Sequence, residues 1–367
     1  MRDFRLGKVF GVEIRADTSW LVIVFLVGWS LYERFQSIFR DLGRGGLLVM
    51  AIVATALFFG SVVVHELSHS VVANRRGIPV KRIRLFIFGG ASETDLDDGK
   101  PADEFVIAAV GPLSSFVLGG VFLAIEAIAG PDAEIVGGIA GYLGGINMIL
   151  GVFNLVPGFP LDGGRLLRAT LWHFTGDLRK ATSWAAMAGQ AVGWGLITLG
   201  VFMLFGGDFT GLWLAAIGWF LTNAARGSYS QLVMRETLEG VRVRDLMTPN
   251  PEVLPMHVSV QHAIDEYVLA RRHSAFPVVD GDRVVGLVTL DRLRAVPPEQ
   301  RAATSVQTVM LHPDGLVIPP DAPAADVVAK LAESPAGRLL VQDGGRLVGI
   351  VSASDVAGWL QRKLSVG

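Results

Sequence analysis

The sequence His65-Glu66-Leu67-Ser68-His69 stands near the end of a long apolar segment, Leu47 to Ala73. An α-helix places positions i and i+4 on one face, so His65 and His69 can present two imidazoles to one metal ion. Glu66 then lies beside that metal, where it can act as a general base. Ionisable side chains at membrane depth are costly and are functional by default. The segment therefore predicts a metal-dependent hydrolase whose site lies within a bilayer.

The overall composition separates a membrane part from a soluble part. The chain has 367 residues, enough for two or three domains, and 51% of them are hydrophobic, with a mean hydropathy of +0.47. The long apolar runs fall within residues 18–224, whereas residues 241–367 have the composition of an ordinary soluble protein. A net charge of −2 gives no reason to expect a nucleic-acid partner. The chain has no cysteine, so a metal must be held by His, Asp or Glu.

The apolar runs predict six transmembrane helices, because about 20 apolar residues cross a bilayer. The expected spans are residues 18–36, 47–73, 104–129, 134–156, 184–205 and 209–225. Alternating β-branched residues in Val80 to Ser92 predict a small membrane-associated β-hairpin or sheet after the second helix. The predicted fold of the membrane part is therefore all-α apart from this element. In the third span, Gly111-Pro112 should kink or break the helix.

Basic residues predict the orientation of these spans. They precede the first span and follow the second, fourth and sixth, whereas on the opposite side only the first loop is basic. Both termini are therefore expected in the cytoplasm, and the N-terminal segment does not resemble a cleavable signal. His65 lies ten residues before Arg75, roughly 15 Å from the cytoplasmic surface at 1.5 Å per residue. We therefore expect a multi-pass protein of a prokaryotic cell membrane, with a site that opens toward the cytoplasm.

Catalytic zinc has three protein ligands and an open water position, so a third ligand is required. The membrane part has one other histidine, His173, but Asp162 is the stronger candidate. It follows the fourth span on the side expected for His65, where Pro157 and Pro160 end the helix and two glycines allow a tight backbone path. An aspartate held there can reach back to the metal. The alternative is an aspartate that caps a helix in a polar loop.

Three motifs together resemble the site-2 protease family of intramembrane zinc metalloproteases. They are His65-Glu66-Leu67-Ser68-His69, Gly111-Pro112, and Asn154 with Pro157 and Leu161-Asp162-Gly163-Gly164. The resemblance covers residues 1–225 and implies His65, His69 and Asp162 as ligands of one Zn²⁺, with Glu66 as catalytic base. It also implies that Asn154 contacts the substrate or stabilises the oxyanion. Family members often carry Asn soon after Gly-Pro, whereas this chain has Ser114 and Ser115.

Residues 241–367 contain a repeat with a spacing of 63, in which Met247 matches Met310 and Val285-Gly286 match Val348-Gly349. Each unit reads as a strand, a helix, two strands with a glycine turn, and a second helix. The two units, 241–302 and 303–367, resemble a tandem pair of α/β CBS domains, with residues 226–240 as a linker helix. The resemblance implies a regulatory module that binds an adenine nucleotide, ATP or AMP, and that forms a homodimer.

In CBS domains an Asp three residues after a Thr or Ser typically holds the ribose hydroxyls. The second repeat has this pair, Ser352 and Asp355, whereas the first has Arg292 at the corresponding place. We therefore expect at most one nucleotide site, near Ser352 and Asp355. A structural or dimerising module without a ligand is the alternative.

The resemblances together imply an intramembrane zinc metalloprotease that acts in regulated intramembrane proteolysis. Its substrate would be a transmembrane protein such as an anti-sigma factor or a similar membrane-tethered regulator. A transporter or channel gated by CBS domains would instead place intramembrane charges along a pathway, often in repeated halves. Here the polar residues gather at the HExxH motif and at Asn154–Asp162. A catalytically inactive scaffold is disfavoured because the three ligands, Glu66 and Asn154 are all present.

Overall fold

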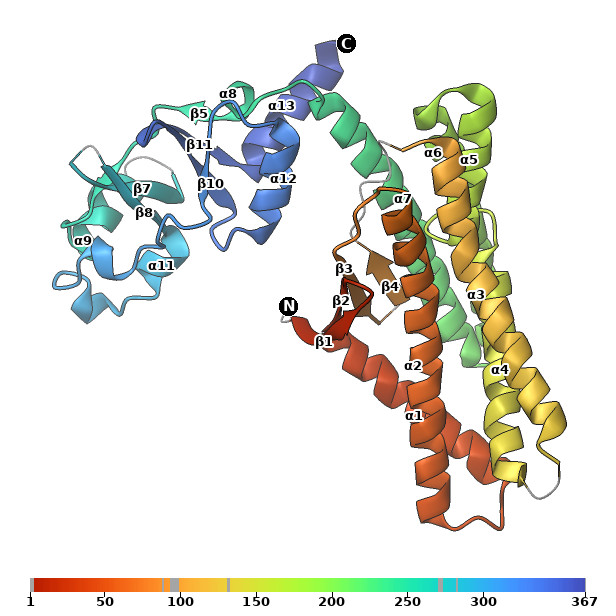
Figure 1. Ribbon diagram of the computed structural model, residues 1–367. Coiled ribbons are helices and arrows are strands. Elements are labelled where there is room, and N and C mark those ends of the chain that lie inside the picture. Colours follow the sequence, from red (N-terminus) through yellow and green to blue (C-terminus); the bar gives the residue numbers. More distant parts are fainter. Residues whose placement is uncertain are drawn as a thin grey trace. The chain divides into compact units, whose positions relative to one another are not determined.

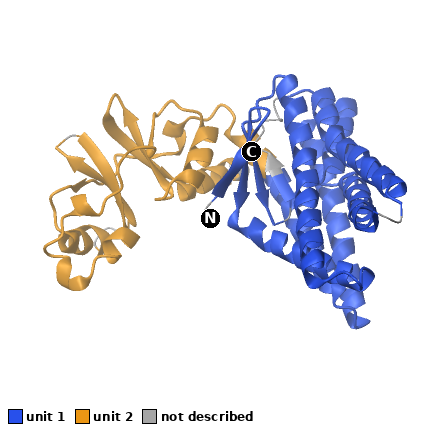
Figure 2. Cartoon of the chain, turned by 60° about the horizontal axis from the view of Figure 1, so that its bottom comes forward, with its two compact units in different colours: residues 1–230 blue, residues 231–367 orange. Residues whose placement is uncertain are grey.

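The computed structural model describes residues 3–87, 89–92, 99–130, 133–269, 273–281 and 283–366. The chain divides into two compact units, Met1–Ser230 and Gln231–Gly367 (Figures 1 and 2). We call them the membrane unit and the C-terminal unit. Phe88, within the predicted β region, and Arg2, among the N-terminal basic residues, lie outside the described residues.

Within the described residues, five helices are long and apolar enough to cross a membrane. They are α1 (Thr18–Ile38), α2 (Arg44–Arg75), α3 (Pro101–Ile128), α4 (Glu134–Asn154) and α6 (Leu178–Phe205). These five coincide with the first five predicted spans. The sixth predicted span falls in α7 (Thr210–Leu238), which is not one of the five and which continues through most of the predicted linker. The sixth span therefore stays a prediction.

The helices fold back on one another as successive antiparallel pairs (Figure 1). The connection between α4 and α6 contains a short helix, α5 (Asp162–Thr175). Pro112 lies inside α3, which runs without a break from Pro101 to Ile128, so the predicted interruption does not divide this helix. Closely packed α3 and α4 place Gly144 against Leu123, with too little room for a Cβ atom on the glycine.

A four-stranded sheet with the order β1-β2-β3-β4 packs beside the C-terminal half of α2 (Figure 1). Its strands are β1 (Asp3–Val9), β2 (Val12–Asp17), β3 (Arg82–Phe86) and β4 (Gly89–Ser92). The last two pair antiparallel in the region predicted to form strands, and β2 lies parallel to β3. Alternation buries Val12, Ile14 and Ile83 on one face, against Ala73 of α2 and Ile107 of α3.

The two N-terminal strands were not expected from the sequence, where residues 1–17 read as a polar and basic segment. Their alternation is nevertheless regular, because β2 buries Val12, Ile14 and Ala16 and exposes more of Glu13 and Arg15. The alternation defines a buried face only when β3 pairs with β2 as a parallel neighbour, and the paired residues are 69 positions apart in the chain. The sheet thereby fixes the start of α1 and the end of α2 in one core.

The C-terminal unit consists of two similar halves, which confirms the predicted tandem CBS module. In the first half β6 (Leu254–Pro255) lies parallel to β7 (Ala275–Asp280), which pairs antiparallel with β8 (Arg283–Thr289) before α11 (Leu290–Arg294). In the second half β9 (Val317–Ile318), β10 (Arg338–Asp343) and β11 (Arg346–Ser352) repeat this arrangement before α13 (Ala353–Val366). Short helical segments, including α9 (Val260–His262) and α12 (Ala324–Glu333), link the first two strands of each half.

The repeated methionines explain how the two halves interlock. α8 (Val243–Leu246) and β5 (Thr248–Pro249) begin the first repeat, but β5 pairs with β11 of the second. A Cβ atom on Gly349 would lie 2.4 Å from Met247 Sδ, and one on Gly286 would lie 2.8 Å from Met310 Sδ. Each methionine therefore packs on the glycine of the other half. This contact explains why a methionine and a glycine both recur at the spacing of 63.

Candidate metal centre

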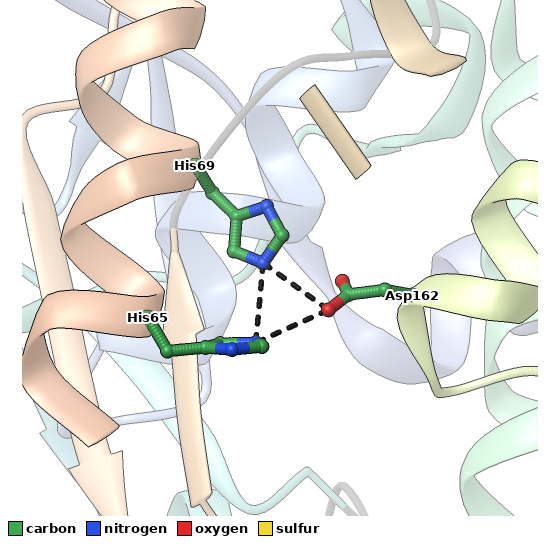
Figure 3. A group of neighbouring side chains, drawn as sticks. All are labelled: His65, His69 and Asp162. Carbon is green, nitrogen blue, oxygen red and sulfur yellow. Dashed lines mark hydrogen bonds and ion pairs between the residues drawn. The ribbon is translucent and has the colours of Figure 1, made fainter. Parts of the chain in front are cut away.

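Three side chains from α2 and α5 converge on one point (Figure 3). His65 and His69 lie one turn apart on α2, and Asp162 is the first residue of α5. Asp162 Oδ2 lies 3.1 Å from His65 Nε2 and 3.2 Å from His69 Nε2, and the two Nε2 atoms are 3.4 Å apart. All three residues are buried. The structure thus brings together the three residues that the sequence predicts as metal ligands.

The dimensions of this triangle suit a zinc ion. Tetrahedral zinc with bonds of about 2.0–2.1 Å to nitrogen and oxygen separates its ligand atoms by about 3.3–3.4 Å. The three observed separations lie between 3.1 and 3.4 Å. Two imidazoles and one carboxylate are also an established donor set for catalytic zinc, which keeps a fourth position open for water. The residues present therefore fit the metal that the family implies.

Both histidines are oriented by hydrogen bonds from their Nδ1 atoms to α3. His69 Nδ1 donates to the carbonyl oxygen of Ile107 at 2.6 Å, which leaves Nε2 as the atom that faces the triangle. His65 Nδ1 lies 2.9 Å from Ser115 Oγ, and the serine is fully buried. Partners of this kind fix the tautomer and the ring orientation of metal-binding histidines. Ser115 occupies the region after Gly111-Pro112 where the family often carries Asn, and the sequence assigned it no role.

Gly111 leaves the space that the two imidazoles fill. A Cβ atom at this position would lie 2.1 Å from His69 Nε2 and 2.8 Å from His65 Nε2. These are the same nitrogen atoms that form the triangle with Asp162. Gly111 is therefore required at the site itself. The sequence predicted that Gly111-Pro112 would kink or break the helix, and it did not predict this role of the glycine.

The turn between α4 and α5 holds Asp162 by close backbone packing. A Cβ atom on Gly163 would lie 2.3 Å from the Val156 carbonyl oxygen, and one on Gly164 would lie 2.3 Å from the Gly158 carbonyl carbon. The turn is attached to α6 through the Phe159 amide, which donates to the Ala185 carbonyl at 3.2 Å. The two glycines after Asp162 thus allow the start of α5 to lie directly on the turn.

A buried ion pair joins α5 to α3 one and a half turns beyond Asp162. Arg168 Nε donates to Glu104 Oε1 at 2.7 Å, and Nη2 lies 2.5 Å from the same oxygen. Glu104 is 1% exposed and Arg168 is 8% exposed. The guanidinium also lies over the ring of Phe159, 5.3 Å from its centroid, in the turn that precedes α5. The pair therefore ties together the three segments that surround Asp162.

Asp162 is suited to act as an anionic ligand. Burial alone would raise the pKa of this carboxyl, but its hydrogen bonds with His65 and His69 outweigh burial and hold the pKa below its ordinary value. Its position in the first turn of α5 is favourable for a negative charge as well. The N-cap of α5 is Leu161, so Asp162 is not the helix-capping aspartate of the alternative. It is the first residue of the helix, and its side chain faces the histidines.

Glu66 lies next to the triangle but is not part of it. It is close enough to His69, His65, Asp162 and Arg165 for their charges to interact with its carboxylate. Its other neighbour is β4, because a Cβ atom on Gly90 would lie 2.5 Å from Glu66 Cγ and 2.9 Å from its Oε1. This location, beside the candidate ligands and against Gly90, suits a base that works on a metal-bound water.

Asn154 is the last residue of α4 and is half-buried. Its Nδ2 atom donates to the Leu150 carbonyl of its own helix at 3.0 Å. Among the described contacts it makes no hydrogen bond to His65, His69 or Asp162. The structure therefore places Asn154 on the helix that leads to the ligand turn, with its amide engaged by the backbone.

The residues predicted to bind a nucleotide form a helix cap. Ser352 precedes α13, and Asp355 Oδ2 accepts hydrogen bonds from the Ser352 backbone amide at 2.8 Å and from its Oγ at 2.5 Å. Asp355 Oδ1 accepts from Thr248 Oγ1 at 3.0 Å. This reciprocal arrangement resembles a capping box, so both residues have structural partners without a ligand. Ser352 and Asp355 are thus brought together with the segment that begins the first repeat.

Comparisons with known proteins agree with the two units. The profile of peptidase family M50 matches residues 53–136 and 129–196, and that of the CBS domain matches residues 243–299 and 306–362. Rip3 of Mycobacterium tuberculosis, which is named as a zinc metalloprotease, is 39% identical, and the alignment covers 97% of this chain and 93% of Rip3. Zinc metalloprotease MJ0392 of Methanocaldococcus jannaschii is 31% identical, with 96% of this chain and 95% of that protein covered. The solved structure of a site-2 protease from Methanocaldococcus jannaschii matches 62% of this chain and 95% of its own, with 27% identity and a TM-score of 0.45.

Proposed function

The chain belongs to peptidase family M50, the site-2 proteases, and we propose that it hydrolyses peptide bonds within or near the transmembrane helices of membrane-anchored regulators. It is a membrane metalloprotease with a tandem CBS module. The observation that carries the finer proposal is the triangle of His65, His69 and Asp162 with Glu66 beside it. Because two of its ligands lie on a helix apolar enough to cross the membrane, the substrate bond has to reach membrane depth.

The residues of the chain divide the chemistry between them. When bound, zinc supplies a Lewis acid and lowers the pKa of its water toward neutrality. Glu66 accepts the proton of the attacking water and delivers it to the leaving amine. His65, His69 and Asp162 would hold the metal, while Ser115 and the Ile107 carbonyl keep the two imidazoles in place. Asn154 can donate to the developing oxyanion once its amide turns away from the Leu150 carbonyl.

The direct test of proteolysis is the Glu66→Gln variant. Reconstituted wild-type protein should cleave a membrane-anchored substrate, such as an anti-sigma factor from the same cell, and Glu66→Gln should abolish cleavage. The variant should keep the zinc content of the wild type, because Glu66 is not one of the three ligands. Unchanged cleavage by Glu66→Gln would refute the proposed mechanism.

We also propose six transmembrane spans, with both termini in the cytoplasm and the metal centre accessible from that side of the cell membrane. The distribution of basic residues supports this orientation. The chain has no cysteine, so single cysteines can be introduced directly. Asp208→Cys, in the exposed turn before α7, should react with an impermeant maleimide added outside intact cells, whereas Ser365→Cys should react only after permeabilisation. The opposite labelling pattern would reverse the proposed orientation.

The CBS pair is proposed as a regulatory and dimerising module that senses ATP or AMP. The tandem repeat and the Ser352–Asp355 pair support it, while the helix cap offers a purely structural role for the same residues. Titration of the full protein with ATP or AMP should give saturable heat, and Asp355→Ala should remove that heat whereas Asp291→Ala in the first repeat should not. Equal binding by both variants would exclude the proposed nucleotide site.

A further inference from the structure

Helices α1 and α2 border an apolar groove on the membrane unit, with a volume of about 690 Å³. Side chains from both helices line it, together with Leu6 of β1 and Leu85 of β3. Its lining is almost wholly apolar, and the polar side-chain groups among the lining residues are two hydroxyls, of Thr55 and Tyr32, and two indoles, of Trp20 and Trp29. A surface of this kind at membrane depth is filled either by lipid chains or by an apolar helix.

The groove leads to the catalytic base along one face of α2. The residues of α2 that line it include Leu48, Ile52, Thr55, Phe59 and Val63, at intervals of three or four. Positions at this spacing share one helix face. The next position in the series is Glu66, three residues after Val63. A helix that lies along this face therefore has one end beside Glu66.

The sheet also connects the groove to Glu66. Leu85 lines the groove, and its antiparallel partner in β4 is Gly90. Gly90 is the residue packed against the Glu66 side chain. The helix face and the sheet thus reach Glu66 from two independent elements.

Small residues along the groove favour a helix over lipid chains as the occupant. Ala56 and Gly60 are four residues apart on α2, and Gly28 lies across from them on α1. Among the described residues, a Cβ atom on Gly60 would meet nothing within 4 Å, and one on Gly28 would meet only Thr55 Oγ1, at 3.4 Å. Backbone left open by small residues four apart is the usual feature of close helix–helix contacts in membranes.

We propose that this groove binds the transmembrane helix of the substrate, so that the helix lies between α1 and α2 and its end reaches Glu66. The proposal rests on the proposed protease function and adds the place where the substrate docks. The groove accepts the side chains of one face of the helix, and the small residues allow its backbone to approach α2. The end of the helix then meets the base at the sheet.

Photo-crosslinking tests this docking site without requiring turnover. Benzoylphenylalanine is placed at Ala56, which lines the groove, or at Leu57, which is 42% exposed and points about 100° away on α2. Both variants carry Glu66→Gln and are reconstituted in bilayers with a tagged synthetic helix of about 20 Leu and Ala residues. We expect crosslinking to the helix about tenfold stronger from position 56 than from position 57. Equal yields, or lipid adducts alone from position 56, would overturn the proposal.

A second measurement uses the active protein. Ala56→Trp fills the groove and should lower cleavage of a membrane-reconstituted substrate about tenfold with unchanged zinc content, whereas Leu57→Trp should leave cleavage as in the wild type. Unimpaired cleavage by Ala56→Trp would contradict groove docking while leaving the protease function intact. If position 56 crosslinks to the helix but the wild-type protein cleaves no substrate, groove docking would stand and the proposed protease function would fail.

Discussion

At the scale of single residues, the metal centre depends on α3 as much as on its ligands. Gly111 provides space beside both Nε2 atoms, and Ser115 and the Ile107 carbonyl orient the rings from their Nδ1 atoms. None of these groups would touch the metal. Their positions explain why the Gly-Pro segment of α3 belongs to the site.

Gly111→Ala should disrupt metal binding, because its Cβ atom would lie 2.1 Å from His69 Nε2. Gly120→Ala, on the same helix, is the matched control, since a Cβ atom there would meet no atom of the described residues within 4 Å. We expect Gly111→Ala to lose most of its zinc during purification and Gly120→Ala to retain the wild-type amount. Metal analysis of the two purified variants checks this, and equal zinc in both would contradict it.

Ser115→Ala should weaken zinc binding or activity about 10–100-fold, the usual effect of removing a hydrogen-bond partner of a metal-binding histidine. Ser114→Ala is the control, because Ser114 Oγ donates to the Gly111 carbonyl of its own helix at 2.7 Å. Competition with a zinc chelator measures the affinities. The prediction fails if the two serine variants release zinc equally.

The cluster of three candidate ligands could be predicted because each residue belongs to a local motif: a spacing of four within one helix, and an aspartate next to two glycines. Ser115 could not, because a serine in an apolar helix has no distinctive spacing and meets His65 only through tertiary packing 50 residues apart. The Glu104–Arg168 pair was missed for a similar reason, since its two charges stand 64 residues apart. The sequence did predict a tight backbone path at Gly163 and Gly164. The reason is that a Cβ atom on either glycine would lie too close to backbone atoms of the preceding turn.

At the scale of elements, α5 is held in place by its ion pair with α3. Removing one member of a buried pair leaves an uncompensated charge and typically lowers the free energy of unfolding by about 3–5 kcal/mol. Arg168→Ala should therefore destabilise the membrane unit strongly and release zinc at lower temperature, because the pair is attached to the helix that begins with Asp162. Arg76→Ala is the control, since Arg76 pairs with Asp103 at a more exposed position. Similar unfolding midpoints for the two variants would contradict this role.

The junction of β2 and α1 should respond to acid. The backbone amide of Ser19 donates to Asp17 and, with the Ser19 side chain and Arg84, holds the pKa of Asp17 below its ordinary value. A lowered pKa stabilises the fold above the unfolded-state value near 3.8, and this contribution is lost as pH falls through the folded-state value. Asp17→Asn should therefore unfold at lower temperature than the wild type at pH 7, and the difference should shrink below pH 4. A constant difference across this range would contradict the assignment.

Some helices and strands could be predicted from the sequence more accurately than others. Long apolar runs fixed α1 to α4 and α6 to within several residues, because the bilayer imposes their length. The strands β1 and β2 were missed because their buried face is defined by β3, far away in the sequence. The hydropathy of α7 is diluted by the polar residues through which the same helix continues toward the C-terminal unit.

At the scale of the whole molecule, the chain joins a membrane metalloprotease to a CBS pair. The repeat of 63 residues predicted the two similar halves, because the repeated spacing gives both halves the same strand and glycine positions. The repeat could not predict that the first segment of each half packs on the other half, as when Met247 of the first half contacts Gly349 of the second. Ser352 and Asp355 show the limit of such a motif, since the residues that suit a ribose also suit a helix cap.

The most direct test of the metal centre is the zinc content of purified protein prepared without chelator, in the wild type and in His65→Ala, Asp162→Ala and His173→Ala. His173 is exposed on α5 and serves as the matched histidine control. We expect about one zinc ion per chain in the wild type and in His173→Ala, and none in the other two variants. Full zinc in Asp162→Ala, or no zinc in folded wild-type protein, would contradict the site formed by α2 and α5.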